Sequence, residues 1–548
     1  MPFNSYEFIL GFLPIIVAGF WALARVAGRT GALLWLVSGS IAFYAYAGWK
    51  ALVIIAPSVL LDYLIASALL RAPSSNDRLR NLLFTTGIVA NILFLGYFKY
   101  RNFFLGTADV IFSTHHDLQP IIVPLGISFL TFQKIAFLAD IKAGDIESVR
   151  FLDYLLFVFF FPRTIAGPII RYNEILPQFR NIALSEIPSH LAVGICLFSI
   201  GLFKKVLVAD NISTIVAAVF DSAPGPGIIE YSGPPTFLTA WTAVLCYAFQ
   251  LYFDFSGYSD MALGAARMLG IRLPMNFNSP FKASSITEFW SRWHITLTRF
   301  LTAYVYTPTV LAITRARRAK GKAILTGKRS TPAAIATIVG IPTLATMAIS
   351  GIWHGAGWQF VVWGLMHGIY LTVNQTWRLI HPRPRSGRLS AAWITKTLCI
   401  ILTFTAVVVA LVFFRAASVP SALSILSGMV GEHGLLSNDT QVLRMVGVDL
   451  PWSLLVPIVP WTWIAILLLW VMALPNSLEL LRPFQPAIDF PEGTHPHAPV
   501  PPPHTMPFLR LVGGGIAISR VGGAVVALLC LLGLTALGRG EKFLYMNF

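Results

Sequence analysis

Long apolar runs separated by short polar segments dominate the chain. A helix needs about 20 residues to cross a bilayer, and apolar runs near that length recur from one end of the sequence to the other. Because lipid offers the backbone no hydrogen-bond partner, each run should fold as a helix. The pattern therefore predicts an all-α polytopic membrane protein with about ten to thirteen helical segments. The clearest runs are 7–24, 51–70, 82–98, 190–209, 235–253, 333–353, 392–414, 453–474 and 521–538.

Composition supports this fold class. Of the 548 residues, 56% are hydrophobic and only 12% are charged, whereas soluble domains carry about 25% charged residues. The first apolar run has no basic segment before it and no small-residue cleavage site after it, so we predict an uncleaved first helix. The four cysteines lie in apolar runs without metal-ligand spacing. We therefore expect buried thiols and no metal site.

The net charge of +16 comes largely from short segments between apolar runs. Segment 314–329 carries seven Lys and Arg residues and segment 378–396 carries five, and neither contains an acid. This charge bias is typical of cytoplasmic loops. Because it accounts for the net charge, we do not expect nucleic-acid binding. Two apolar helices separate the segments, so the turn Gly355–Gly357 is predicted on the outer side, with His354 at the outer mouth of the membrane.

We expect a single membrane domain, 1–548, with three special segments. These are a basic cytoplasmic loop at 314–329, a proline-rich linker at 475–512 and an aromatic tail at 539–548. Proline is densest at 491–507, a composition with little ability to pack. The histidines of this stretch could bind a metal, although solvated linker side chains are the favoured interpretation; they are His495, His497 and His504.

Two acidic residues, Asp254 and Asp260, fall in or beside an apolar run. On a straight helix they point about 240° apart, so they cannot form one paired-carboxylate site. The favoured interpretation is structural, with each carboxylate satisfied by nearby hydroxyl, amide or basic groups. A direct catalytic role for either one is left open.

The segment "SSITEFWSRWHI" predicts the start of a helix. Ser285 is the expected N-cap, and Glu288 stands three residues later, which is the spacing of a capping box. His294 is expected to follow on the same helix, next to Arg292 and Trp293.

Two further histidines, His354 and His367, occur in the apolar stretch "GIWHGAGWQFVVWGLMHGIYL" at 351–371. An ionisable side chain at membrane depth usually has a function. On one continuous helix the two would point about 220° apart and lie about 20 Å from each other along the axis, so they would not share a metal or a proton. The small residues after His354 would let a substrate approach, whereas His367 sits in a pattern typical of helix packing.

Several motifs together carry a resemblance to a known family. They resemble the successive motifs of the membrane-bound O-acyltransferases (MBOAT), and more narrowly the bacterial branch of alginate O-acetylation and teichoic-acid D-alanylation proteins. The similarity runs from the first helix to about residue 375. The motifs are "QLYFDFSGYSDMA" (250–262), "NFNSPF" (276–281), "ITEFWSRWHITL" (286–297) and "GIWHGAGWQFVVWGLMHG" (351–368), with "FPRTIAGPIIRY" (161–172) before them.

The resemblance implies a ring of transmembrane and re-entrant helices around a central tunnel. It implies that His354, in the Trp-His-Gly motif, is the catalytic base, since an imidazole pKa of about 6.5 suits proton transfer near neutral pH. It also implies that His294, in the Arg-Trp-His motif, orients the acyl group or donates a hydrogen bond to its carbonyl oxygen. Candidate substrate-binding residues are Trp353, Asp254, Arg292 and Trp293.

The expected reaction is transfer of an acyl group, acetyl first, from a cytoplasmic thioester to a hydroxyl of an exported polysaccharide or other envelope glycan. The donor would be acetyl-CoA or an acyl carrier protein, and no bound cofactor is needed. D-alanyl transfer to an envelope polymer is an alternative. A polysaccharide or lipid transporter, or a glycan-polymerising protein, would explain the spans but not the motifs. We expect the bacterial inner membrane, contact with membrane lipid, and a separate periplasmic SGNH-type acyltransferase or esterase.

Two more hypotheses concern segments outside the histidine motifs. The basic loop either docks an acidic donor through its positive charges or only sets the topology; its residues include Arg315, Arg317, Arg318 and Lys320. The terminal "FLYMNF" resembles an aromatic motif of the bacterial branch, with Met546 where phenylalanine is usual. Tyr545 is then an acyl relay that needs a base, because the hydroxyl pKa is about 10. The alternative is an interfacial anchor.

Overall fold

The computed structural model describes residues 1–116, 118–182, 184–221, 234–381, 389–435, 459–488, 520–537 and 543–544. These residues form helices and connecting turns and contain no β-strand. Among them are six helices long and apolar enough to cross a membrane. The predicted all-α multi-pass fold is therefore confirmed. The six are Glu7–Val26, Trp49–Arg71, Asp77–Phe112, Leu184–Phe220, Pro332–His354 and Trp393–Arg415.

The chain divides into two compact units. Unit 1 comprises Met1–Leu207, Phe255–Met275 and Ser477–Phe548, and unit 2 comprises Val208–Asp254 and Asn276–Asn476. The 32-residue helix α11 (Phe237–Met268) supplies residues to both. The ring of helices around a tunnel that the resemblance implies stays a prediction.

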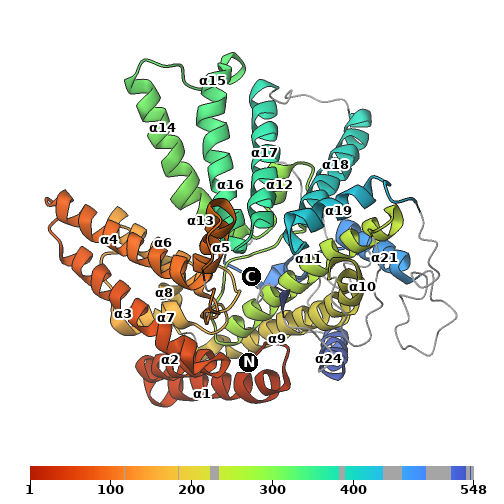
Figure 1. Ribbon diagram of the computed structural model, residues 1–548. Coiled ribbons are helices and arrows are strands. Elements are labelled where there is room, and N and C mark those ends of the chain that lie inside the picture. Colours follow the sequence, from red (N-terminus) through yellow and green to blue (C-terminus); the bar gives the residue numbers. More distant parts are fainter. Residues whose placement is uncertain are drawn as a thin grey trace. The chain divides into compact units, whose positions relative to one another are not determined.

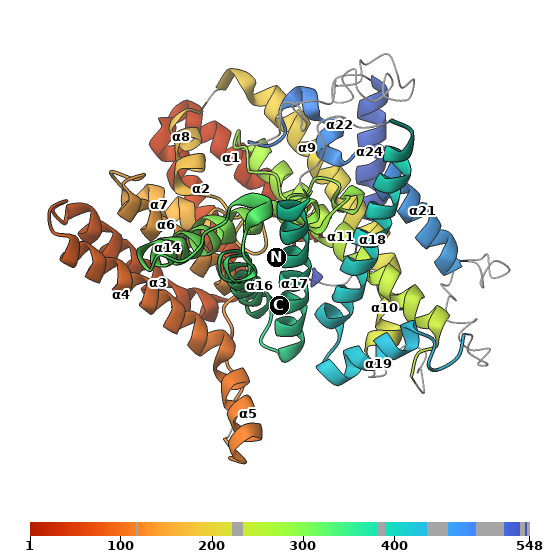
Figure 2. The same ribbon diagram turned by 90° about the horizontal axis from the view of Figure 1, so that it is seen from above.

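Unit 1 is built from helical hairpins. In it α1 packs on α2, α2 on α7, and α3 on both α4 and α6 (Figure 2). Later in the chain, α24 (Arg520–Thr535) packs on α9 (Ile187–Phe203). The other helices are α1 (Leu13–Val26), α2 (Gly28–Ala47), α3 (Trp49–Arg71), α4 (Asp77–Leu95), α5 (Arg101–Phe112), α6 (Ile127–Ala143), α7 (Phe151–Phe159), α8 (Tyr172–Arg180) and α22 (Ser477–Leu480).

Unit 2 is centred on the hairpin of α16 (Ile341–His354) and α17 (Trp358–Ile380), with α18 (Leu389–Arg415) beside α17 (Figure 1). Glycines let the hairpin close: a Cβ on Gly351 would lie 2.2 Å from the carbonyl oxygen of Phe360. The backbones of α16 and α17 therefore touch. The other helices are α10 (Asp210–Phe220), α12 (Ile286–Trp290), α13 (Ile295–Leu301), α14 (Thr307–Ala319), α15 (Pro332–Ile335), α19 (Val419–Met429) and α21 (Val459–Ala473).

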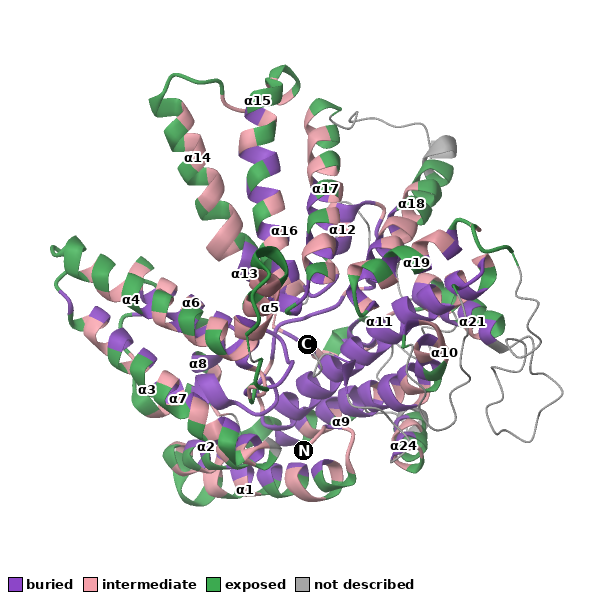
Figure 3. Cartoon of the chain, in the orientation of Figure 1, coloured by how far each residue is buried: buried purple, intermediate pink, exposed green. Residues whose placement is uncertain are grey.

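The apolar helices differ in how much of their surface is covered. Of the most apolar 18 residues of Leu184–Phe220, 67% are buried, against 17% for Asp77–Phe112. In Figure 3, α9 is buried over most of its length, whereas α4 is mostly exposed or intermediate. Hydropathy alone does not separate these two cases, because lipid and a protein core are both apolar.

Two predicted segments differ from the structure. The basic loop 314–329 begins as helix, because α14 continues to Ala319 and places its arginines near a helix C-terminus, where positive charge is favourable. The predicted linker 475–512 is packed at its start, since Leu478 and Leu481 are buried and the Ile488 N–H donates to the Leu273 carbonyl at 3.1 Å. Its proline-rich part, 491–507, lies outside the described residues.

Candidate active site

His294 does not lie on the helix where the sequence placed it, and that prediction is wrong. Helix α12 ends at Trp290, and His294 is the N-cap residue of the next helix, α13. Its φ of 43° and ψ of 52° are left-handed, a strained conformation for a residue with a side chain. Such strain persists only where surrounding contacts determine the backbone, and it is frequent at functional sites.

Those contacts come from Asn276, eighteen residues earlier. Its carbonyl oxygen accepts from the Ile295 N–H at 2.9 Å. Its side-chain Oδ1 lies 3.0 Å from His294 Nδ1, accepts from Thr296 Oγ1 at 3.0 Å, and is 3.4 Å from the Thr296 N–H. Asn276 therefore joins the motifs "NFNSPF" and "RWHIT" at His294, a contact that the sequence analysis missed.

The same geometry assigns the tautomer of His294. A backbone N–H can only donate, so the Asn276 atom facing Thr296 is the amide oxygen, and His294 Nδ1 donates to it. Nε2 then carries the lone pair. His294 is fully buried and lies outside the six candidate spans. Burial lowers its pKa to about 3, so the imidazole is neutral at working pH.

His354 is the last residue of helix α16, which ends where the turn at Gly355–Gly357 was predicted. Aromatic rings enclose the His354 side chain. It is 3% exposed, and its ring centroid lies 5.1 Å from those of Trp363 and Phe414. Gly355 follows in an extended conformation, and a Cβ there would lie 2.1 Å from the ring of Phe360. A larger residue after His354 would thus displace the aromatic wall.

Trp353 lies near both candidate catalytic histidines. Its ring centroid is 4.8 Å from that of His354 and 6.1 Å from that of His294. The structure thus gathers around one tryptophan two motifs that stand sixty residues apart in the sequence. Both histidines and Trp353 belong to unit 2.

His367 is closer to His354 than a continuous helix would allow. The chain turns between α16 and α17, and the Trp363 ring centroid lies 5.1 Å from His354 and 5.0 Å from His367. His367 Nδ1 accepts from Trp290 Nε1 at 3.3 Å, which ties α17 to α12. This contact supports the packing role that the sequence assigned to His367.

Arg292 is engaged with the backbone and side chains of its own loop. Its Nε and Nη2 donate to Glu288 Oε1 at 3.1 and 2.9 Å, and Nη1 donates to the Asn278 carbonyl at 3.2 Å. Burial raises the Glu288 pKa, but hydrogen bonds from Ser284 and the charge of Arg292 outweigh it, so the pKa is below its usual range. A substrate contact by Arg292 stays a prediction.

The expected cap and the neighbouring tryptophan are both in place. Ser285 Oγ accepts from the Glu288 N–H at 3.2 Å, although the Glu288 carboxylate reaches back to Ser284 and not to Ser285. Trp293 is 7% exposed, stacks on Phe289 at 5.7 Å and meets Phe277 edge-on at 5.1 Å. Trp293 is thus packed among aromatic side chains. A contact between Trp293 and a substrate stays a prediction.

The two acidic residues of α11 are both buried. In unit 1, Asp260 Oδ2 accepts from Lys204 Nζ and from Ser477 Oγ, each at 2.7 Å. Its predicted structural role is thus supported. In unit 2, Asp254 is 1% exposed. Its role in substrate binding stays a prediction.

The donor-docking and relay residues differ in what the structure describes. Arg315, Arg318 and Lys320 are exposed, whereas Arg317 donates to the Ala323 carbonyl from Nε at 2.9 Å and from Nη2 at 2.7 Å. Tyr545 lies outside the described residues.

Part of the C-terminal tail is buried in unit 1. Phe543 is 0% exposed, its ring meets Tyr258 edge-on at 4.7 Å, and Lys205 Nζ lies 4.8 Å from its centroid. This placement disfavours a tail that only rests at the membrane interface.

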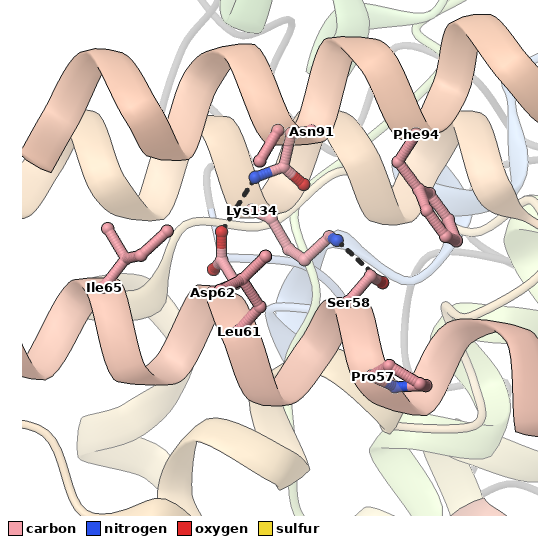
Figure 4. Close-up of a pocket in the computed structure, with 9 residues that line it drawn as sticks. Pro57, Ser58, Leu61, Asp62, Ile65, Asn91, Phe94 and Lys134 are labelled. Carbon is pink, nitrogen blue, oxygen red and sulfur yellow. Dashed lines mark hydrogen bonds between the residues drawn. The ribbon is translucent and has the colours of Figure 1, made fainter.

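A second group of buried polar residues lies in unit 1, at a cavity of about 220 Å³ between α3, α4 and α6 (Figure 4). Asp62 Oδ1 accepts from Asn91 Nδ2 at 2.9 Å, and Oδ2 accepts from the Tyr154 hydroxyl at 3.0 Å. Lys134 Nζ donates to Ser58 Oγ at 3.1 Å. The sequence analysis missed this network, although a lone aspartate in the run 51–70 was a signal for it.

Comparison with known proteins places this geometry in a family. Residues 41–326 match the model of MBOAT, the membrane-bound O-acyltransferase family. The chain belongs to this family. It is 38% identical over 461 residues to the peptidoglycan O-acetyltransferase of Helicobacter pylori, covering 79% of this chain and 80% of that protein. The predicted family and O-acyltransferase activity are confirmed. His294 lies within the matched residues 41–326, whereas His354 lies beyond them.

Other relatives extend the range of acyl groups within the family. A probable alginate O-acetylase of Pseudomonas aeruginosa is 33% identical over 429 residues, or 77% of this chain and 73% of that protein. The teichoic acid D-alanyltransferase of Streptococcus thermophilus is 28% identical over 311 residues, or 55% and 70%. This membrane-bound O-acyltransferase is thus similar to proteins named for both acetyl and D-alanyl transfer.

Proposed function

We propose that this membrane O-acyltransferase moves an acetyl group from a cytoplasmic thioester to a hydroxyl of an exported cell-envelope glycan, at the bacterial inner membrane. The relatives at 38% and 33% identity are named for O-acetylation of peptidoglycan and of alginate, and both acceptors are glycans. The D-alanyltransferase relative is less similar and covers less of the chain. Acetyl transfer is therefore preferred over the D-alanyl alternative.

The observation that carries the proposal is the pair of buried histidines whose rings both lie near Trp353. In the reaction, the acceptor hydroxyl oxygen attacks the thioester carbonyl carbon, the carbon–sulfur bond breaks, and the hydroxyl proton goes to His354 Nε2 or Nδ1. The proton then passes to the departing thiolate. His294 orients the reacting groups through Nε2, which accepts hydrogen bonds because Nδ1 donates to Asn276. The alternative in which neutral His294 donates to the carbonyl oxygen is less consistent with this tautomer.

The proposal is tested in cells with and without the protein, by mass spectrometry of glycans released from the envelope. We expect ester-linked acetyl groups to disappear without the protein and with His354→Ala, while the variant stays inserted in the membrane. His367→Ala is the matched control, because its losses should follow the amount of folded protein. Normal acetylation in the His354→Ala cells would refute the assigned role of this histidine.

For donor docking, we propose that the exposed arginines at the end of α14 attract the phosphates of coenzyme A or an acidic carrier protein. Replacing Arg315, Arg317, Arg318 and Lys320 with glutamine should raise the KM for the donor. The rise should be larger at low salt, where screening is weaker. An unchanged KM at low salt, with topology intact, would leave topology as the role of these charges.

For the outer half-reaction, we propose that the hydroxyl that attacks the thioester is that of Tyr545. A nucleophile of a separate periplasmic SGNH-type partner then attacks the phenolic acetyl ester, the Tyr545 oxygen leaves and takes a proton, and the partner passes the acetyl group to the glycan hydroxyl. The burial of Phe543, two residues earlier, supports a tail that folds into the protein. Tyr545→Phe removes the nucleophilic oxygen and keeps the ring. Glycan acetylation should then stop, and a normal rate would mean that the tail serves only as an anchor.

A further inference from the structure

Unit 1 contains a cavity of about 470 Å³ that the acyl-transfer site does not explain. Its wall combines the end of α1, helix α8, the start of α9, the end of α11 and the segment after α22. Polar and charged side chains line it; they include Gln178, Glu186, His190, Arg267 and Arg272.

Arg267 is buried at this cavity without a matching acceptor. It is 3% exposed; within the part of the chain that the structure describes, its Nε and Nη1 have no hydrogen-bond partner, and its Nη2 meets the Phe484 carbonyl at 3.5 Å. Among the described residues, no carboxylate forms an ion pair with Arg267 or with the half-buried Arg272. Because a buried and uncompensated guanidinium is costly, this arrangement points to an anionic ligand.

The rest of the wall is consistent with an anion at the Arg267 end. His190 is 5% exposed; its Nε2 lies 3.5 Å from Glu186 Oε2, and its Nδ1 has no hydrogen-bond partner among the residues that the structure describes. The Glu186 side chain is 58% exposed, so that carboxylate is largely solvated. Glu174, the other acid of the wall, accepts from the Arg171 N–H at 3.0 Å. Glu186 therefore offsets the charge of Arg267 only in part, because it is largely solvated and forms no ion pair with Arg267.

The wall is held in place by specific hydrogen bonds. Trp21 Nε1 donates to the Met268 carbonyl at 2.9 Å. Gln178 Oε1 accepts from the Arg272 N–H at 2.8 Å, and its Nε2 donates to the Arg272 carbonyl at 3.0 Å. The cavity is therefore a formed feature of unit 1, and Arg267 projects from a rigid helix end.

Charge bias indicates the side of the membrane. Trp21 stands near the end of α1, and Arg25 and Arg29 flank the turn into α2, where no acid occurs between residues 8 and 61. By the positive-inside rule this end of α1 is cytoplasmic. The cavity therefore faces the compartment that supplies thioesters and contacts the inner lipid leaflet.

We propose that the Arg267 cavity binds a phosphate group. A guanidinium fork matches two phosphate oxygens and forms charge-assisted hydrogen bonds with them. Two sources share this chemistry: the phosphates of the acyl donor, coenzyme A or a phosphopantetheine arm, and the headgroup of an anionic phospholipid. The donor source rests on the proposed function, whereas phosphate binding itself does not.

The test uses the purified full-length protein and isothermal titration calorimetry. The probes are inorganic phosphate and coenzyme A, each measured in neutral detergent and then in nanodiscs of phosphatidylcholine alone or with phosphatidylglycerol. Arg267→Gln should weaken phosphate and coenzyme A binding by about tenfold or more, and Arg267→Lys should lose less because it keeps the charge. Arg78→Gln, an exposed change at the start of α4, is the matched control and should bind as the unmodified protein does.

The outcomes separate the two sources. Coenzyme A that binds more tightly than phosphate in both kinds of nanodisc identifies the donor. If phosphatidylglycerol weakens coenzyme A binding to the unmodified protein but not to Arg267→Gln, the lipid headgroup is the ligand. No binding of any probe, or equal binding by Arg267→Gln, overturns the proposal. If Arg267→Gln does not fold, Arg272→Gln is measured in its place, and unchanged binding there has the same meaning.

Failure of this inference and failure of the proposed function are distinguishable. Binding is measured without turnover, and His354→Ala should bind phosphate as the unmodified protein does. Glycan acetylation that persists when no phosphate binding is found overturns only the cavity assignment.

Discussion

The loop around His294 and the network around Asp62 bury polar side chains to the same extent but use them differently. Around Asp62, each carboxylate oxygen accepts a hydrogen bond from a neighbouring side chain, so both oxygens have a partner. Around His294, Asn276 holds one ring nitrogen and thereby sets the other as a proton acceptor. Burial of polar groups is common to both, so it does not identify the reacting site. The arrangement expected of a reacting site is a side chain fixed through one atom that presents a hydrogen-bond acceptor through another, as His294 does.

The two regions should therefore respond differently to mutation. Removing one partner of a buried hydrogen bond lowers the free energy of unfolding. Removing or misplacing a group that orients the reactants acts on the rate, and a misplacement of about 1 Å can cost about 100-fold. Measuring both quantities for each variant tests the distinction.

The largest effect on stability is expected for Asp62→Ala. The change leaves the Asn91 amide and the Tyr154 hydroxyl without their acceptor and leaves the Lys134 charge uncompensated. Such losses cost about 3–5 kcal/mol. Equilibrium unfolding in mixed detergent should show this, while the rate per folded protein stays close to that of the unmodified chain. A variant of normal stability and impaired transfer would place Asp62 in the catalytic machinery.

A smaller effect is expected for Asn276→Ala, and it should fall on the catalytic rate rather than on the free energy of unfolding. Loss of an orienting partner typically lowers activity about 10–100-fold. The initial rate of ester formation should fall by that factor with little change in KM, because His294 loses its tautomer and its orientation. Asn276→Asp keeps an acceptor at Oδ1 and should recover part of the rate. Equal rates for the Ala and Asp variants would count against the positioning role.

A still smaller effect is expected when the charges of the network are removed together. The double variant Asp62→Asn with Lys134→Met keeps an acceptor for Tyr154 and leaves no isolated charge. Replacing buried charges jointly is often neutral, so the cost should be about 1 kcal/mol or less. Unfolding of both single variants and the double variant completes the cycle. Additive losses would show that Asp62 and Lys134 act independently.

The smallest effect is the pH dependence that His294 adds to stability. Its folded pKa of about 3 is below the ordinary value of about 6.5, so the unfolded chain binds more protons. The stabilisation that neutral His294 provides is complete above pH 6.5 and declines as pH falls from 6.5 toward 3. Between pH 8 and pH 6, His294→Gln should reduce the loss of stability by less than about 1 kcal/mol. Parallel curves for the two proteins would contradict the pKa assignment.

The sequence was sufficient to predict the features that depend on local pattern. Run length and hydropathy predicted helices such as α3 and α16, because a membrane helix satisfies its own backbone within one segment. The small residues after His354 predicted the end of α16, since they favour a turn over continued helix. The quoted motifs predicted the family that the comparisons confirmed.

Only the tertiary structure decided which distant residues meet. It moved His294 off its predicted helix, because hydrogen bonds from Asn276 outweigh the local preference for continued helix. It brought His354 and His367 both against the ring of Trp363 through a glycine-lined hairpin. It left Arg267 buried at a cavity whose walls come from several helices, and no described carboxylate forms an ion pair with this arginine. Local propensity and hydropathy describe one segment at a time, whereas these contacts depend on how several segments pack, which no single window of the sequence contains.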